Sequence, residues 1–85
     1  MKNLFRAIAQ IENEKQCAAF LRDLCTISEL NEMAKRWEAV RLLDRKTPVR
    51  EIAAKTGLST ATVCRVSQWL RFGAGGYRQI LEKSK

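Results

Sequence analysis

Apolar residues recur along this chain at intervals of three and four positions, the spacing of amphipathic helices. Leu4, Ile8 and Ile11 form the first such stripe and predict a helix over residues 3–12. Asn13 can cap a second helix, because its side-chain oxygen can accept a hydrogen bond from a free amide of the first turn. The stripe of that helix consists of Cys17, Phe20, Leu21 and Leu24. No segment shows the alternation of a strand, so the pattern predicts an all-α protein.

The segment Thr26-Ile27-Ser28-Glu29 has the residues of a capping box, in which the threonine and glutamate side chains bond each other's backbone amides. It predicts the start of the longest helix, which we expect to run to about Arg45. Its apolar residues on or near one face are Leu30, Met33, Ala34, Trp37, Val40 and Leu43.

A helix-turn-helix is predicted over residues 48–72. Thr47-Pro48 opens its first helix, with the threonine as cap and the proline in the first turn, where its missing N–H is not needed. Gly57 can end that helix sharply because glycine adopts positive φ without steric cost. Ser59 then caps a second helix, Thr60 to Phe72, before the glycine-rich link Gly73-Ala74-Gly75-Gly76. Tyr77, Ile80 and Leu81 predict a last short helix over residues 77–83.

The second helix of this motif has two chemically different faces. Val63 and Val66 are expected to pack against the preceding helix. The opposite side carries small or polar residues that would let the helix enter the major groove of DNA: Thr60, Ala61, Cys64 and Arg65. The same pattern is also compatible with an ordinary tight corner between two helices.

The charge is distributed unevenly along the chain. Of the net charge of +7, residues 1–42 carry +1 and residues 43–85 carry +6, so the basic half contains the predicted helix-turn-helix. A basic surface attracts a polyanion through counterion release, which gives an affinity that falls steeply with salt. A merely solvated basic face is the alternative.

Several classes of protein are disfavoured by the composition. The chain has no histidine, and its three cysteines, Cys17, Cys25 and Cys64, lack a metal-binding spacing, so we expect neither a metal site nor a cofactor. Cys17 and Cys25 are interpreted as buried thiols in a reducing compartment. No stretch is apolar enough to span a membrane and no signal peptide is visible, which favours a cytoplasmic location. The scattered carboxylates and the short chain argue against an enzyme.

Eighty-five residues predict one small domain, 1–85, but short helices depend on tertiary packing for their stability. The helices over residues 3–45 and 77–83 expose more apolar surface than one helix-turn-helix can cover. We therefore expect a homodimer in which these helices pack across a two-fold axis, an arrangement that suits palindromic DNA. A compact monomeric bundle is the alternative.

Three segments together resemble the Trp repressor-related YerC/YecD family and, more distantly, the tryptophan repressor: Asp23–Leu30, Ala34–Glu38 and Ser59–Val66. The resemblance covers roughly residues 17–82. It implies a six-helix, intertwined, obligate dimer that binds operator DNA through the second helix of its helix-turn-helix.

The resemblance also suggests a possible effector pocket at Arg36, Arg65, Val66 and Trp69. Arg36 and Arg65 match two arginines that sandwich the corepressor tryptophan in the repressor. Val66 stands where the repressor has a glycine, and Trp69 stands where it has a serine that receives the ligand's amino group. Both side chains would intrude on the slot, so tryptophan is doubtful as a corepressor here. We interpret Trp69 either as an indole that fills this slot or as a packed core aromatic.

Together these patterns predict a sequence-specific DNA-binding transcriptional regulator, more simply a repressor than an activator, that acts as a dimer on a palindromic operator. The partner is double-stranded DNA. Some residues are expected to position the phosphate backbone and others to face base edges. The predicted set is Arg45, Lys46, Thr47, Arg50, Ser59, Thr60, Ala61, Thr62, Cys64 and Arg65. A small helical protein-interaction module and a nonspecific DNA-binding protein remain as alternatives.

Overall fold

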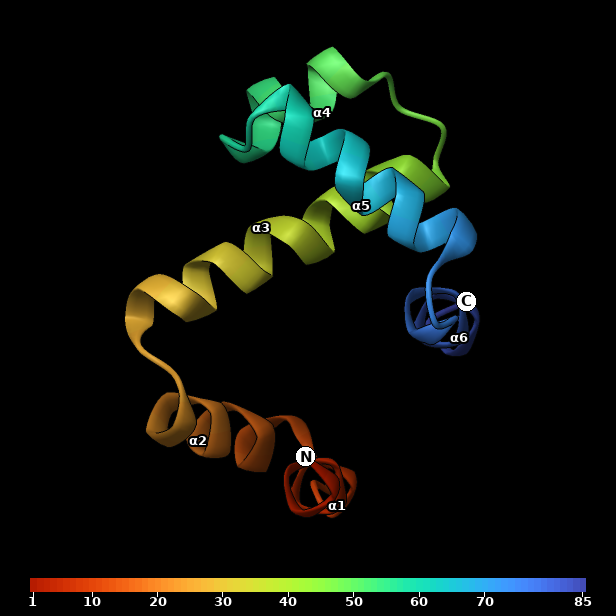
Figure 1. Cartoon of the computed structure of the whole chain (residues 1–85). Coiled ribbons are helices and arrows are strands. Elements are labelled where there is room, and N and C mark those ends of the chain that lie inside the picture. Colours follow the sequence, from red (N-terminus) through yellow and green to blue (C-terminus); the bar gives the residue numbers. More distant parts are fainter. The chain divides into compact units, whose positions relative to one another are not determined.

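The computed structural model describes all 85 residues and contains six helices (Figure 1). They are α1 (Lys2–Ala9), α2 (Glu14–Leu24), α3 (Ile27–Asp44), α4 (Val49–Thr56), α5 (Thr60–Phe72) and α6 (Gly76–Lys83). The chain divides into two compact units, residues 1–31 and residues 32–85, and α3 begins in the first unit and continues through the second. The predicted all-α architecture with six helices is confirmed. None of these helices combines the length and the apolarity needed to cross a bilayer.

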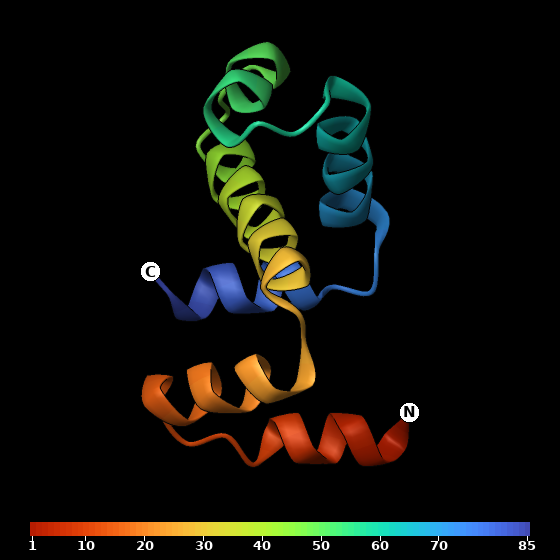
Figure 2. The same cartoon turned by 90° about the vertical axis from the view of Figure 1, so that its left-hand side faces the viewer.

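The first unit contains α1 and α2, joined by a tight turn (Figure 2). α1 ends at Ala9, earlier than the predicted residue 12, because the chain must leave the helix for Asn13 to cap α2. Asn13 adopts an extended conformation, and its Oδ1 accepts a hydrogen bond from the Gln16 N–H at 2.9 Å. The Gln16 side chain reciprocates by accepting the Glu12 N–H at 3.0 Å. The predicted cap is therefore confirmed.

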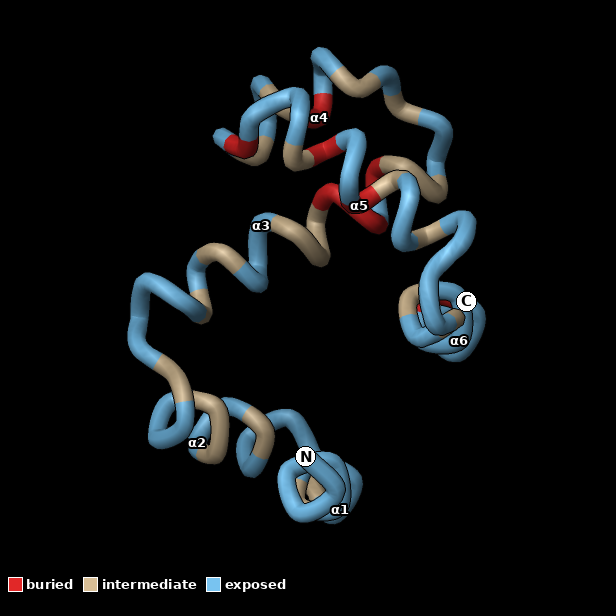
Figure 3. The backbone as a smooth tube through the Cα atoms, viewed as in Figure 1, coloured by how far each residue is buried: buried red, intermediate tan, exposed pale blue.

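Neither α1 nor α2 contains a buried residue (Figure 3). Two short helices joined by a turn have no third layer of structure to enclose their apolar faces. For this reason the expectation of buried thiols at Cys17 and Cys25 is wrong for the single chain: both are free and only partly buried.

α3 begins with the predicted capping box. The Glu29 N–H donates to Thr26 Oγ1 at 3.1 Å, and the Thr26 N–H donates to Glu29 Oε1 at 2.8 Å. These two bonds satisfy amides that no helical carbonyl can reach. The hydrogen bond from the Thr26 backbone, followed by that from the Thr26 hydroxyl, lowers the pKa of Glu29 from its ordinary value.

The second unit contains the hydrophobic core of the chain. Each of its helices supplies at least one buried side chain (Figure 3). The buried residues are Ala39, Val40, Leu42, Ile52, Leu58, Val63, Val66 and Leu81. Partly buried apolar side chains extend this cluster on its outside: Trp37, Leu43, Val49, Ala53, Leu70 and Tyr77.

The connection from α3 to α4 differs from its prediction. The Lys46 N–H donates to the Leu43 carbonyl at 2.9 Å and the Thr47 N–H donates to the Leu42 carbonyl at 3.0 Å, the two bonds of a Schellman motif. Lys46 occupies its left-handed position, with φ of 63°. Thr47 therefore closes α3 and does not cap α4. Pro48 is the N-cap, with φ −62° and ψ 146°, so the predictions of a threonine cap and of proline inside the first turn are wrong.

Asp44 connects the end of α3 with the C-terminal part of the chain. Its carboxylate lies 3.7 Å from Arg78 Nη1 and 3.4 Å from Lys85 Nζ. The Asp44 side chain is only 19% exposed, whereas its two partners are about half exposed. These two ion pairs orient α6 relative to α3 more than they stabilise the fold, because solvent screens pairs of this kind.

Candidate nucleic-acid interface

The turn between α4 and α5 is fixed by several backbone and side-chain bonds. Gly57 has φ of 80°, and its N–H donates to the Ala53 carbonyl at 2.9 Å. Thr56 Oγ1 donates to the Ile52 carbonyl at 2.8 Å and accepts the Leu58 N–H at 3.2 Å. Leu58 is buried and anchors the turn in the core. The predicted glycine turn is confirmed, while the contribution of Thr56 was not anticipated.

Ser59 caps α5 as predicted. Its Oγ accepts the Thr62 N–H at 3.1 Å and donates to Thr62 Oγ1 at 3.0 Å. The Ser59 hydroxyl is thus already occupied as donor and acceptor within the first turn. Thr62 is partly buried beside it.

α5 separates its residues into an inner and an outer face. Val63 and Val66 are fully buried and pack in the core with Ile52 of α4. The outer residues, Thr60, Ala61, Cys64 and Arg65, are exposed. The predicted division of this helix is therefore present, and the exposed face begins at the N-terminal end of the helix.

Five basic residues on the helix-turn-helix and the segment before it have no acidic partner. All are exposed, and none lies within 4.0 Å of a carboxylate: Arg45, Lys46, Arg50, Arg65 and Arg71. Lys55 differs, because its Nζ is 3.2 Å from Glu51 Oε1 on the same helix. The first turn of α4 lacks a side-chain cap, so its amides are also free of side-chain acceptors.

Comparison with known proteins identifies the family of this chain. The family model of the Trp repressor protein matches residues 1–85, the whole chain. The chain belongs to the Trp repressor family. This membership confirms the resemblance inferred from the sequence, and it covers the N-terminal residues as well as the helix-turn-helix.

Proteins of similar sequence or structure are found in several bacteria. An uncharacterized protein, YerC, of Bacillus subtilis (strain 168) is 35% identical over 85 residues, which cover 100% of this chain and 82% of YerC. The crystal structure of a TrpR-like protein from Eubacterium eligens ATCC 27750 is similar with a TM-score of 0.89 and 35% identity, over 96% of this chain and 84% of that one. A proposed Trp repressor from Staphylococcus aureus gives a TM-score of 0.89 and 32% identity, over 98% and 83%.

The four residues of the predicted effector pocket lie in different surroundings. Val66 is fully buried in the core. Arg36 Nε is 3.9 Å from Glu32 Oε1, an ion-pair distance too long for a hydrogen bond, and has no hydrogen-bond partner. Arg65 is exposed on α5. Trp69 is 47% exposed and is not a core residue. That its indole fills a slot between the two arginines stays a prediction.

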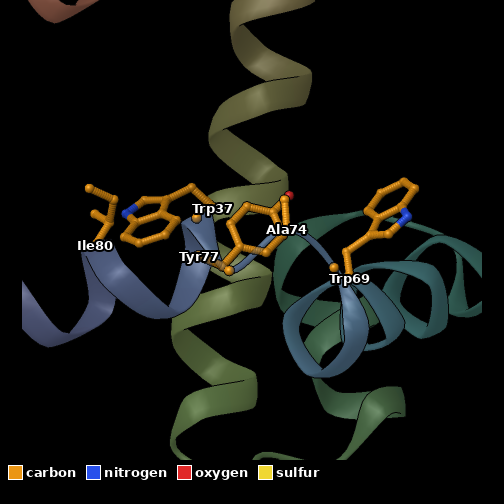
Figure 4. A pocket seen from close by; sticks show the side chains of 8 residues that line it. Trp37, Trp69, Ala74, Tyr77 and Ile80 are labelled. Atoms are coloured by element: carbon orange, nitrogen blue, oxygen red, sulfur yellow. The ribbon is translucent and has the colours of Figure 1, made fainter.

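Trp69 instead lines an apolar pocket that sequence reasoning missed. The cavity has a volume of about 540 Å³ and is bordered by Trp37 of α3, Tyr77 and Ile80 of α6, and the link Gly73–Gly76. Figure 4 shows Trp69 on one side of the hollow, with Tyr77 and Trp37 on the other. The rings of Trp37 and Tyr77 have centroids 6.4 Å apart and are tilted by 44°, within the range of favourable aromatic pairs. We call these residues the aromatic pocket.

The link that closes the aromatic pocket depends on glycine. A Cβ atom at position 73 would collide with the carbonyl oxygen of Trp69, so a side chain there would force the end of α5 to change. The glycine run was visible in the sequence, but its role as a pocket wall was not, because the other walls come from helices far apart along the chain.

Proposed function

We propose that this chain is a sequence-specific DNA-binding regulator of transcription that acts as a dimer on a two-fold-symmetric operator and represses by occluding a promoter. The observation that carries the proposal is the outer face of α5, whose small and polar residues lie on the other side of the helix from two fully buried valines. The helix-turn-helix and the segment before it also carry exposed cations without acidic partners. Membership in the Trp repressor family supports it.

The proposed contacts divide into positioning and readout. Arg45, Lys46 and Arg50, with the first-turn amides of α4, would bind phosphates. Thr60 and Ala61, at the N-terminal end of α5, would face base edges in the major groove, with Cys64 one turn further. Because Ser59 is occupied as the cap, we assign it a structural role in this interface.

The side chains proposed to face base edges, Thr60, Ala61 and Cys64, cannot make a bidentate contact to guanine. Of the proposed surface on the helix-turn-helix, only Arg50 and Arg65 have a guanidinium group that could do so. We therefore propose that specificity depends partly on DNA shape and bridging water. Two recognition helices of a dimer would enter successive major grooves about one helical turn apart.

We further propose that DNA binding does not need tryptophan as a corepressor. Val66 is fully buried, so the space that a glycine would leave beside α5 is filled by a branched side chain. Trp69 is directed to the aromatic pocket, whose lining contains neither Arg36 nor Arg65.

The decisive experiment selects genomic fragments bound by the purified protein, with and without millimolar L-tryptophan. We expect enrichment of a two-fold-symmetric site in both conditions. Enrichment only with tryptophan would contradict the ligand-independent part of the proposal. Enrichment in neither condition would favour a protein-interaction module, and equal affinity for selected and random duplexes would favour nonspecific binding.

Arg50→Ala combined with Arg65→Ala tests the assigned surface. We expect the pair to weaken operator binding strongly and to reduce its dependence on salt, because two cations near the DNA are lost. The matched control is Lys15→Ala with Lys83→Ala, which removes two charges from α2 and α6. Equal effects of the two double variants would mean that only net charge matters.

A further inference from the structure

A second pocket, of different chemistry, lies in the second unit between the end of α3, the C-terminal half of α5 and the start of α6. Its volume is about 230 Å³, and it shares no residue with the aromatic pocket. Leu43 and Leu70 supply the apolar part of its lining. The polar side chains of the lining are Asp44, Lys46, Ser67, Arg71 and Arg78. We call this site the basic pocket.

The charges around the basic pocket do not balance. Three cations line it against one carboxylate, which leaves a net charge of +2. That carboxylate, Asp44, already lies at ion-pair distance from Arg78 and from Lys85, while Lys46 and Arg71 have no carboxylate within 4.0 Å. Cations gathered around one hollow repel one another. A bound anion relieves this repulsion, so the pocket favours a ligand with about two negative charges.

The backbone at Lys46 supports a function for its side chain. With φ of 63°, Lys46 takes the left-handed position of the Schellman motif, which glycine usually occupies because a side chain is strained there. Strained positions of this kind cluster at sites that bind ligands. In this chain the strained residue carries an ammonium group and lines the basic pocket.

The polar groups of the lining select among anions. Arg71 and Arg78 have planar guanidinium groups, which bind phosphate through paired hydrogen bonds. Neither the Ser67 hydroxyl nor the Asp44 carboxylate takes part in a hydrogen bond within the chain, so one donor and one acceptor are available to a ligand. A phosphodiester of DNA carries one charge and no donor for Asp44. A phosphate monoester carries nearly two charges at pH 7, and a hydroxyl group on it supplies the donor.

We propose that the basic pocket binds a small phosphate monoester that bears a hydroxyl group. Its phosphate lies among Lys46, Arg71 and Arg78, and its hydroxyl donates to Asp44. The volume suits so small a ligand, since sites for larger ligands measure about 300–1,000 Å³. Leu43 and Leu70 are partly buried against the core and keep water from one side of the site, which strengthens the charge interactions.

A titration of the full-length protein with three phosphate compounds at constant ionic strength tests the proposal. Glycerol 3-phosphate is a monoester with hydroxyl groups, methyl phosphate is a monoester without one, and dimethyl phosphate is a diester like the DNA backbone. We expect glycerol 3-phosphate to cause saturable shifts in the backbone amide resonances of Lys46, Ser67 and Arg78. Its dissociation constant should be at least about threefold lower than that of methyl phosphate and about tenfold lower than that of dimethyl phosphate, because these lack a hydrogen bond or a charge as well.

Two substitutions connect the binding to the pocket. Arg71→Gln should raise the dissociation constant of glycerol 3-phosphate at least about tenfold, because it removes a guanidinium group from the lining. Lys46→Gly should raise it about fivefold although it relieves backbone strain, so this loss of binding cannot come from a weakened fold. The matched control is Arg22→Gln, which removes the same charge from an exposed residue of α2 and should leave binding unchanged.

Three results would overturn the proposal. Equal affinities for glycerol 3-phosphate and dimethyl phosphate would assign the basic pocket to the DNA backbone. Equal losses in Arg71→Gln and Arg22→Gln would mean that net charge alone attracts the anion. Shifts that do not saturate with any of the three compounds would exclude a phosphate site.

Lys46 also belongs to the proposed DNA surface, so the ligand and an operator phosphate compete for one side chain. This consequence rests on the proposed function. Saturating glycerol 3-phosphate should weaken operator binding at least about threefold at constant ionic strength, and Arg71→Gln should remove this response. Operator affinity that ignores a bound ligand would refute the competition alone. Because ligand binding is measured without DNA, a protein that selects no operator would refute the proposed function and leave the pocket assigned.

Discussion

The two units of this chain are both built from amphipathic helices, yet they differ in how far they bury their apolar side chains. In residues 32–85, segments of four helices enclose Ile52, Val63 and Val66 so completely that these side chains lose all contact with water. In residues 1–31, α1 and α2 contain no fully enclosed side chain and bury a few residues only in part. The difference teaches that the helix-turn-helix can be held by its own core, while the N-terminal helices depend on a surface outside their unit.

The largest effect is expected in the core of the second unit. Ile52→Ala should lower the free energy of unfolding by about 2–5 kcal/mol, because it removes buried methyl groups and leaves a cavity. Leu24→Ala in the first unit, where the side chain is 52% exposed, should cost less than about 1 kcal/mol. Chemical denaturation followed by circular dichroism measures both. Equal costs would remove the distinction between the two units.

The turn at Gly57 should show the next largest loss of stability. Gly57→Ala forces a side chain into the left-handed region and should cost about 1–2 kcal/mol. Gly76→Ala at the start of α6 is the matched control, since a Cβ atom there would meet open space and the new residue restricts the unfolded chain. The melting temperatures of the two variants compare them directly, and a Gly76→Ala protein that is the less stable of the two would contradict this assignment.

Lys46 allows the cost of a left-handed backbone conformation to be tested at a position that is not glycine. Its positive φ at the end of α3 is strained, so Lys46→Gly should be more stable than Lys46→Ala by about 1 kcal/mol. Both variants lose the same charge, which leaves backbone strain as the main difference between them. If the two unfold at the same denaturant concentration, the left-handed position does not strain the chain.

Hydrogen exchange should separate the units without any substitution. If association protects α1 and α2, a tenfold dilution of a mostly dimeric sample should speed the exchange of their amides about threefold, because the monomer fraction rises with the square root of dilution. The amides of α4 and α5 should respond less, since their unit has a core of its own. Uniform behaviour along the chain would indicate a single cooperative domain.

The smallest effect is expected at the capping box that opens α3. The pKa of Glu29 is lowered in the folded chain, so its ionised form stabilises the fold. This contribution is present above the pKa of the unfolded chain and disappears as the pH falls through the folded value. The stability advantage over Glu29→Gln should therefore be seen at neutral pH and vanish in acid. Glu14→Gln, in the first turn of α2, controls for the loss of one carboxylate.

Local rules were sufficient wherever a few neighbouring residues determine the structure. The Thr26–Glu29 box, the Asn13 and Ser59 caps, and the glycine turn all form within four residues, and the sequence predicted each of them. The inner face of α5 followed from helical spacing alone. These features explain why the helix-turn-helix itself was predictable.

Features that depend on distant segments or on competing local structures were not predictable. The sequence predicts Thr47 as the N-cap of α4. In the structure its amide donates to the Leu42 carbonyl in the Schellman motif that ends α3, and Pro48 is the N-cap of α4. The aromatic pocket needs Trp37, Trp69 and Tyr77 from three helices, which no short pattern brings together. For the same reason the sequence alone does not indicate that Trp69 borders a pocket.

The two faces of α5 have a consequence for how this protein can diversify. Thr60, Ala61 and Cys64 are exposed and belong to no part of the core, whereas Val63 and Val66 are part of it. Substitutions on the outer face are therefore nearly free of folding cost. If this face reads DNA as we propose, its sequence preference can change independently of stability, and likeness of fold alone does not transfer a binding site from one relative to another.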